Sequence, residues 1–159
     1  MQKYIFYTSL FIFFICPKLF SQNITGHVVG ITDGDTFKLL TKDSLLIKVR
    51  LANVDCPERK QPFSQKAKQF TSDAVFDQYI TIVELKKDRY GRSIANVFYG
   101  DSLNLGHELV RNGLAWHYIK YSNDPVLQEL EDKAKNDKLG LWQDPTSIAP
   151  WEWRKRKRE

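Results

Sequence analysis

Three acidic side chains and one arginine are of types that suit phosphate-ester chemistry. Asp35, Arg50, Asp55 and Glu58 all lie in the stretch between positions 31 and 58. Hard divalent cations prefer oxygen ligands such as carboxylates, and an arginine guanidinium binds phosphate oxygens through paired N–H groups. If the fold brings these four side chains together, they would form a cation site next to an anion site.

A β-hairpin would bring the acidic residues together. Apolar and polar residues alternate over 36–40 and again over 46–51, and a polar turn lies near Lys42. Asp35 comes directly before the first of these strands, and Asp55 follows the second. Antiparallel strands joined by a tight turn place these two flanking positions at the same end of the hairpin.

Arg50 lies within the second predicted strand, between Val49 and Leu51. Successive side chains of a strand point to opposite faces. We therefore expect Arg50 to lie on the face opposite to these apolar neighbours, away from the core.

Similar patterns predict the other elements of the chain. Five short strands with an inserted helix favour a β-rich α+β fold, namely a small five-stranded OB-fold β-barrel with about three α-helices packed outside it. The predicted strands cover 23–31, 36–40, 46–51, 79–85 and 93–99, and the predicted helices run from Pro62 to Ala74, over 103–112, and from Pro125 to a stop at Gly140.

The excess of positive charge lies mostly at the C-terminus. The formal net charge is +5, but residues 154–158 form one uninterrupted basic run, and the part of the chain before them is close to neutral. Overall charge is therefore weak evidence for a nucleic-acid partner. Two interpretations of the tail, residues 145–159, stay open: a flexible arm that raises affinity for phosphate backbones, or a solvated segment that affects only solubility.

The N-terminus has the pattern of a signal peptide. Lys3 is followed by an uncharged apolar run from Tyr4 to Cys16, which suits the core of such a peptide and is short for a membrane span. We expect residues 1–21 to be removed during export and Gln22 to begin the mature protein, with the main domain over 22–144. An uncleaved N-terminal anchor is the alternative.

Four motifs occur in an order that resembles the staphylococcal nuclease family, also called thermonuclease or micrococcal nuclease. The similarity covers roughly residues 24–142, and it implies a calcium-dependent phosphodiesterase on an OB-fold. Such an enzyme cuts DNA and RNA with little sequence preference and leaves 3′-phosphate products. The four motifs are Asp33-Gly34-Asp35-Thr36, Arg50 with Val54-Asp55-Cys56-Pro57-Glu58, Asp88-Arg89-Tyr90-Gly91-Arg92, and Leu109-Val110-Arg111-Asn112-Gly113-Leu114-Ala115.

The resemblance assigns a role to each member of the acidic cluster. Asp35 and Asp55 match the family's calcium-binding aspartates, and Cys56 would contribute its backbone carbonyl. Glu58 matches the glutamate that orients or deprotonates the attacking water. Considered alone, each aspartate would be an ordinary turn residue, and Glu58 an acid at the start of a helix.

Arg50 and Arg92 match the family's two catalytic arginines. Guanidinium forks bind the equatorial oxygens of a phosphoryl transition state and stay charged at any working pH. Each arginine taken alone could be an ordinary surface charge.

Four further residues match substrate-binding positions of the family. Arg89 and Tyr90 would contact a terminal phosphate, while Tyr121 and Tyr118 fall near tyrosines that stack on bases. Packing of aromatic side chains at the barrel mouth is the alternative for the last two.

The sequence therefore predicts a secreted, calcium-dependent, nonspecific endonuclease that acts on DNA and RNA. A monomer without a stable protein partner is the default expectation. A catalytically inactive OB-fold module that binds nucleic acid is the main alternative. A third is a surface-anchored binding or assembly factor held by an uncleaved leader.

Overall fold

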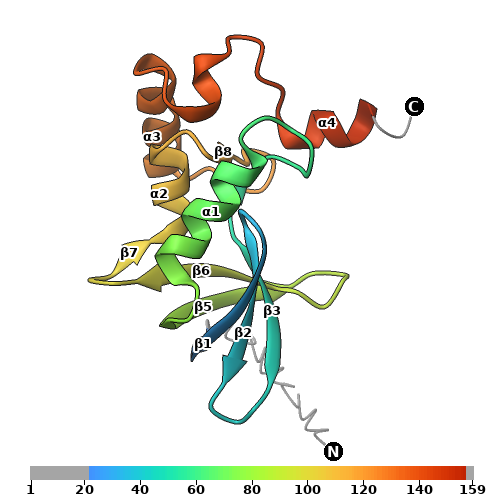
Figure 1. Ribbon diagram of the computed structural model, residues 1–159, viewed down its shortest axis with the longest axis vertical. Coiled ribbons are helices and arrows are strands. Elements are labelled where there is room, and N and C mark those ends of the chain that lie inside the picture. Colours follow the sequence, from blue (N-terminus) through green and yellow to red (C-terminus); the bar gives the residue numbers. More distant parts are fainter. Residues whose placement is uncertain (1–21, 157–159) are drawn as a thin grey trace, which may run out of the picture.

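The computed structural model describes residues 22–156, and a closed five-stranded β-barrel forms their centre (Figure 1). The signal peptide expected over residues 1–21 lies outside this range. The predicted barrel is confirmed, with strands one or two residues longer than the sequence pattern suggests at some ends. Its strands are β1 (Gln22–Asp33), β2 (Thr36–Thr41), β3 (Leu46–Leu51), β5 (Tyr79–Lys87) and β6 (Ser93–Tyr99).

One long strand and one parallel pairing close the barrel. The first half of β1 pairs with β5 and its second half with β2, and register shifts after Val28 and Ile31 bend the strand between its two partners. Closure comes from β3 and β6, which run parallel so that Arg50 is opposite Ile94. Arg50, the arginine of the acidic cluster, therefore lies in the strand pairing that closes the barrel.

The core follows from the two-residue alternation of the strands. Val49 and Leu51 of β3 are buried, whereas the side chain of Arg50 between them points the other way, as predicted. Each strand buries one face in this manner, and the helices cover the open end. The largest fully buried side chains are Phe37, Leu39, Ile82, Leu105, Leu109 and Leu127.

Three predicted helices pack outside the barrel, and their ends are set by local caps. Figure 1 shows α1 (Ser64–Val75), α2 (Leu105–Arg111) and α3 (Pro125–Asn136) on one side of the strands. The first of these helices begins two residues later than predicted, because Phe63 has a left-handed φ of 65° that a helix cannot include. The second begins later because the Asn104 side chain accepts hydrogen bonds from the N–H groups of Gly106 and His107.

Short elements at the end of the barrel complete the surroundings of the acidic cluster. The two-residue strand β4 (Val54–Asp55) pairs with β8 (Trp116–His117), so that Asp55 lies opposite Trp116. The remaining elements in the described range are β7 (Leu103–Asn104), the 3-10 helix η1 (Gly140–Gln143) and the C-terminal helix α4 (Pro150–Arg156).

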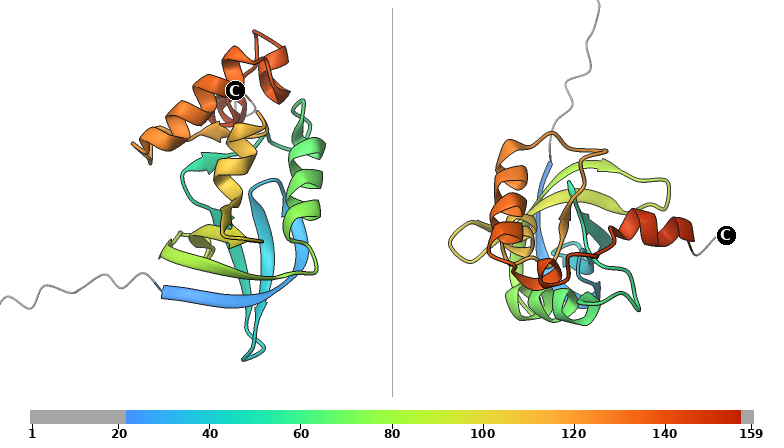
Figure 2. Two further views of the ribbon diagram at one scale, coloured as in Figure 1. Left: turned by 90° about the vertical axis from the view of Figure 1, so that its left-hand side faces the viewer. Right: turned by 90° about the horizontal axis from the view of Figure 1, so that it is seen from above.

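The helix α4 differs from both expectations for the tail. Its residues 150–156 are helical, and Figure 2 shows the helix beside the loop that precedes α1. The contacts of Trp151 and Arg154, described below, hold it in place. The part of the tail that the structure describes is therefore neither a flexible arm nor only a solvated segment.

Gly34 lets α1 pack directly against the turn that precedes Asp35. The hydroxyl of Thr71 in α1 donates a hydrogen bond of 2.6 Å to the carbonyl of Gly34. A Cβ atom at position 34 would lie 2.8 Å from Cβ of Ala67 and 2.9 Å from Sγ of Cys56. The helix and the turn are thus in contact, with no room for a side chain.

We predict that Gly34→Ala destabilises the protein by about 1–3 kcal/mol, because the added methyl group overpacks this contact. Urea unfolding followed by circular dichroism measures the effect. Gly30→Ala is the matched control, since its added Cβ would meet only Cδ of Lys38 at 3.7 Å. Equal free energies of unfolding for the two variants would show that the contact can relax without cost.

Candidate active site

Arg50 is the centre of the acidic cluster. Its Nη1 donates to Oδ1 of Asp35 at 2.6 Å, and its Nη2 donates to Oδ1 of Asp55 at 2.7 Å. Asp35 is 3% exposed and Asp55 is 1% exposed, so both carboxylates are almost completely removed from water. The structure thus brings together the two aspartates and the arginine that the predicted hairpin relates.

The barrel strands fix the position of Asp35. Arg50 is the register partner of Thr36 across the β2–β3 pair. Asp35 directly precedes Thr36, so it lies next to Arg50 at the end of the hairpin. Its Oδ1 also accepts a hydrogen bond of 2.9 Å from Oγ1 of Thr36, and its Oδ2 accepts one of 3.0 Å from the N–H of Cys56. Every oxygen of this buried carboxylate therefore has a donor.

Asp33 is a third aspartate at the site, and its place in the first sequence motif did not assign it a role of its own. Its Oδ1 accepts a hydrogen bond of 3.3 Å from the N–H of Asp35. Burial and the neighbouring negative charge of Asp35 raise the pKa of Asp33 to about 7. The signal that could have identified it is its position two residues before Asp35 in the same tight turn.

Glu58 lies at the edge of the cluster, on the loop between β4 and α1. Its side chain is 37% exposed, which leaves it open to solvent on one side. Gln61 holds this loop, since its Oε1 accepts from the N–H of Glu58 at 2.7 Å and its Nε2 donates to the carbonyl of Ile148 at 3.0 Å. The loop that carries Glu58 is thus connected to the segment before α4.

Arg154 of α4 is a residue of the cluster that sequence reasoning missed. Its Nη2 donates to Oδ2 of Asp55 at 2.7 Å, and its Nη1 donates to Oε1 of Glu58 at 2.5 Å. Burial raises the pKa of Asp55, although its contacts with Arg154 and Arg50 oppose this shift. Arg154 could not be assigned to the site from the sequence, because Arg154 begins a run of five basic residues, a pattern typical of a solvated tail.

The backbone of Arg92 lies near the cluster, but its side chain pairs with Asp88 outside the cluster. It comes directly before β6, two residues ahead of the Ile94 that is opposite Arg50. Its Nε donates to Oδ2 of Asp88 at 2.7 Å, and its Nη2 forms an ion pair with the same oxygen, also at 2.7 Å. In the described range, no hydrogen bond or ion pair joins Arg92 to the acidic cluster, so the structure brings only one of the two predicted arginines onto the carboxylates.

The turn around Arg92 contains two of the predicted substrate-binding residues. The guanidinium of Arg89 lies over the ring of Tyr90, 4.9 Å from its centroid, and Tyr90 is 68% exposed. Asp88 orders this turn by accepting from the N–H groups of Tyr90 and Arg92. A cation and an exposed ring therefore lie together on the surface.

The two predicted stacking tyrosines are in contact, and Tyr121 is exposed whereas Tyr118 is half-buried. The rings of Tyr118 and Tyr121 meet edge to face at 4.8 Å, and Tyr121 is 61% exposed. Tyr118 instead stacks in parallel on Trp151 of α4, with ring centroids 5.0 Å apart and planes at 1°.

The available donors fit a hard, oxygen-binding cation. Among residues 22–156, no group of three or more His, Cys, Asp or Glu side chains is arranged to hold a metal ion directly. Asp35 and Asp55 nevertheless offer adjacent carboxylates, and Glu58 lies beside them. Burial raises the pKa of the Cys56 thiol well above its usual value, which disfavours a thiolate and hence a soft metal.

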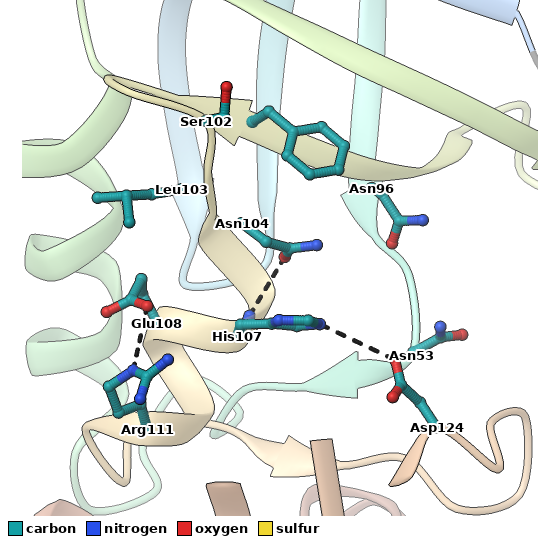
Figure 3. Close-up of a pocket in the computed structure, with 10 residues that line it drawn as sticks. Asn53, Asn96, Ser102, Leu103, Asn104, His107, Glu108, Arg111 and Asp124 are labelled. Atoms are coloured by element: carbon teal, nitrogen blue, oxygen red, sulfur yellow. Dashed lines mark hydrogen bonds and ion pairs between the residues drawn. The ribbon is translucent and has the colours of Figure 1, made fainter. Parts of the chain in front are cut away.

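A separate pocket of about 490 Å³ lies between β6, β7 and α2 (Figure 3). His107 and Asp124 approach each other across it, with 3.9 Å between Nε2 and Oδ2. None of the residues that the sequence analysis assigned to a site lines this pocket. The chemistry of this molecule is therefore expected at the Arg50 cluster.

Comparison with known proteins agrees with this assignment. A family model described as staphylococcal nuclease homologue matches residues 48–144. A protein of Haemophilus influenzae named uncharacterized endonuclease is 38% identical over 157 residues, which are 99% of this chain and 88% of that protein. A protein of Shigella flexneri named micrococcal nuclease is 37% identical over 140 residues, which are 82% of this chain and 80% of the relative.

The matched segment runs from β3 to beyond α3, and thus contains Arg50, Asp55, Glu58 and Arg92, on the barrel described above. The relatives extend the similarity over nearly the whole chain. This protein belongs to the staphylococcal nuclease family.

Proposed function

We propose that this protein is an exported, calcium-dependent endonuclease that hydrolyses phosphodiester bonds of DNA and RNA with little sequence preference and leaves 3′-phosphates. Membership of the family supports the nuclease class, and two of the relatives have endonuclease or nuclease in their names. The calcium requirement, the range of substrates and the export are the parts of the proposal that need experiments.

The observation that carries the proposal is the position of Arg50 between two buried carboxylates, one of which shares Arg154 with Glu58. A guanidinium has five N–H donors, and the contacts with Asp35 and Asp55 use one on each terminal nitrogen. The remaining donors can bind the oxygens of a phosphate that approaches the cluster. The cluster thus combines ligands for a cation with a binding group for the phosphate next to it.

Asp35, Asp55 and the backbone carbonyl of Cys56 would hold calcium. Bound there, the ion would supply a Lewis acid that polarises a phosphoryl oxygen. A carbonyl ligand does not depend on the side chain, so the buried thiol of Cys56 is compatible with this role.

Glu58 serves as the general base. Its carboxylate is partly open to solvent, so a water molecule can reach it, and it accepts the proton of this water as the oxygen attacks phosphorus. Arg50 and Arg92 bind the phosphoryl oxygens as negative charge grows on them. The bond from phosphorus to the 5′ oxygen breaks, this oxygen takes a proton from water to become a hydroxyl, and the phosphate stays on the 3′ side.

Arg89, Tyr90 and Tyr121 bind the substrate beyond the scissile phosphate. The cation at Arg89 attracts a neighbouring phosphate, and the exposed ring of Tyr121 offers a face to a base, with Tyr118 next to it. Such contacts are to the backbone and to the faces of bases, which explains a lack of sequence preference.

We predict that Glu58→Gln and Arg92→Ala each reduce kcat for single-stranded DNA by about 10²–10⁴-fold, because each loses a group that acts in the transition state. The assay uses residues 22–159 with calcium and with a chelator. Arg111→Ala is the control for Arg92, because Arg111 pairs with Glu108 on the surface and lies outside the cluster.

Cleavage that persists in both variants would leave the family assignment intact and disprove the site. Binding of DNA without any cleavage by the unmodified chain, unaffected by the chelator, would instead favour an inactive nucleic-acid-binding module.

We predict that Arg89→Ala, made in the Glu58→Gln background, weakens binding of single-stranded DNA. The slope of log affinity against log salt should become less negative by about 0.7, the value of one phosphate contact. Fluorescence anisotropy over a range of salt concentrations measures it. The control is Lys155→Ala, whose side chain pairs with Glu152. An unchanged slope would mean that Arg89 does not contact a phosphate.

We predict that the full-length chain, expressed in a bacterium, is recovered outside the cytoplasm with Gln22 as its first residue. N-terminal sequencing or intact-mass measurement decides this. Recovery of a membrane-bound protein that still carries residues 1–21 would instead establish an anchor.

A further inference from the structure

The helix α4 covers the acidic cluster and the neighbouring tyrosine at the same time. We call residues 150–156 the C-terminal latch. Arg154 reaches the carboxylates from this latch, and Trp151, one turn earlier in the same helix, covers Tyr118. Two different proposed subsites, one for a cation and one for a base, are thus in contact with one short element.

Arg154 occupies the oxygen atoms that a cation would need. Its Nη2 binds Oδ2 of Asp55 at 2.7 Å, and its Nη1 lies 3.3 Å from Oδ1 of the same carboxylate. The same Nη1 binds Glu58. Because Arg50 also donates to Oδ1 of Asp55, both oxygens of this carboxylate already have guanidinium partners.

The charges of the cluster explain why a cation is needed at this position. Besides Asp33, which lies next to Asp35, the cluster contains the carboxylates of Asp35, Asp55 and Glu58, and Arg50 brings only one positive charge to them. Arg154 brings a second. A calcium ion in place of Arg154 would neutralise the cluster more completely, since it carries two positive charges in a smaller volume.

Trp151 covers Tyr118 in the way that a base would. The two rings are parallel, 5.0 Å apart between centroids and 1° apart in plane. An aromatic side chain stacks on a base through the same face. The indole of Trp151 also meets Trp116 edge to face at 5.8 Å, which fixes the start of the latch.

The latch can be displaced because its contact with Glu58 is partly open to solvent on both sides. The side chain of Arg154 is 34% exposed and that of Glu58 is 37% exposed, while Asp55 beneath them is 1% exposed. Solvent screens the pair of Arg154 with Glu58, and such partly exposed pairs contribute little net stability, whereas the buried Asp55 needs another cation when Arg154 leaves. An ion from solvent can therefore reach Glu58 first and then replace Arg154 on Asp55.

We propose that the C-terminal latch is an internal competitor of the active site: Arg154 takes the place of the divalent cation and Trp151 takes the place of a base on Tyr118. This inference rests on the proposed function, because it uses the cation and base subsites assigned there. Calcium and nucleic acid must displace the latch to bind, so the chain without metal is held in a closed form.

Calcium affinity, measured by isothermal titration calorimetry without nucleic acid, tests the proposal. If the closed form makes up about 90% of the molecules, the latch lowers the apparent affinity about tenfold. We expect Arg154→Ala to bind calcium about tenfold more tightly than the unmodified chain. Lys155→Ala removes the same charge from the next residue, which pairs with Glu152 instead, and should leave the affinity nearly unchanged.

A variant without a change of charge separates the latch from simple electrostatics. Trp151→Ala removes the stacking on Tyr118 and leaves every charge of the cluster in place. It should raise calcium affinity in the same direction as Arg154→Ala, because it favours the open form. Hydrogen exchange of residues 150–156 in the unmodified chain should become faster when calcium is added.

Each other outcome overturns the proposal in a recognisable way. Tighter binding by Arg154→Ala, with no effect of Trp151→Ala and no change in hydrogen exchange, would mean that Arg154 acts through its charge alone. Unchanged affinity in both variants would mean that calcium and the latch occupy different places. If no variant binds calcium, the latch proposal fails together with the calcium requirement. DNA cleavage in the activity assay would then still support the nuclease function.

Discussion

Two carboxylates that are buried side by side in their charged forms need positive charge between them, and Arg50 supplies that charge. Its two terminal nitrogens bind Asp35, just before β2, and Asp55, just after β3, which lie at the same end of the β2–β3 hairpin. The hairpin, the loop after it and the parallel pairing of β3 with β6 all meet at this guanidinium. These ion pairs compensate for the buried negative charges at this end of the barrel, and they also shape the site where phosphate chemistry is proposed.

The arrangement of the cluster also explains why a second cation is present. With Arg50 alone, the cluster would keep an excess of negative charge on groups of which two are almost inaccessible to water. Burying charge without compensation is costly, so a chain without metal gains by bringing its own cation from elsewhere. Arg154 has this role in the structure, and α4 is helical where it meets the cluster.

The sequence was sufficient for the barrel and for the part of the cluster that the hairpin defines. Strand alternation, turn residues and the order of motifs place Asp35, Arg50 and Asp55 at one end, and the structure agrees. Local patterns could not reveal the contacts of Arg154, because a basic run has the same composition whether it is solvated or docked. Nor could they show that Arg92 pairs with Asp88, since that choice depends on the geometry of a single turn.

The loop that carries Glu58 and the segment before α4 share one side chain, that of Gln61. Its amide accepts from the backbone of Glu58 and donates to the backbone of Ile148, so the two segments are mechanically linked although they are far apart in sequence. Contacts between such distant segments carry a cost in loop-closure entropy, which the rest of the fold must offset. The position of the acidic loop therefore depends on the folded chain as a whole, and an extended chain has no assembled centre with which to attack nucleic acid.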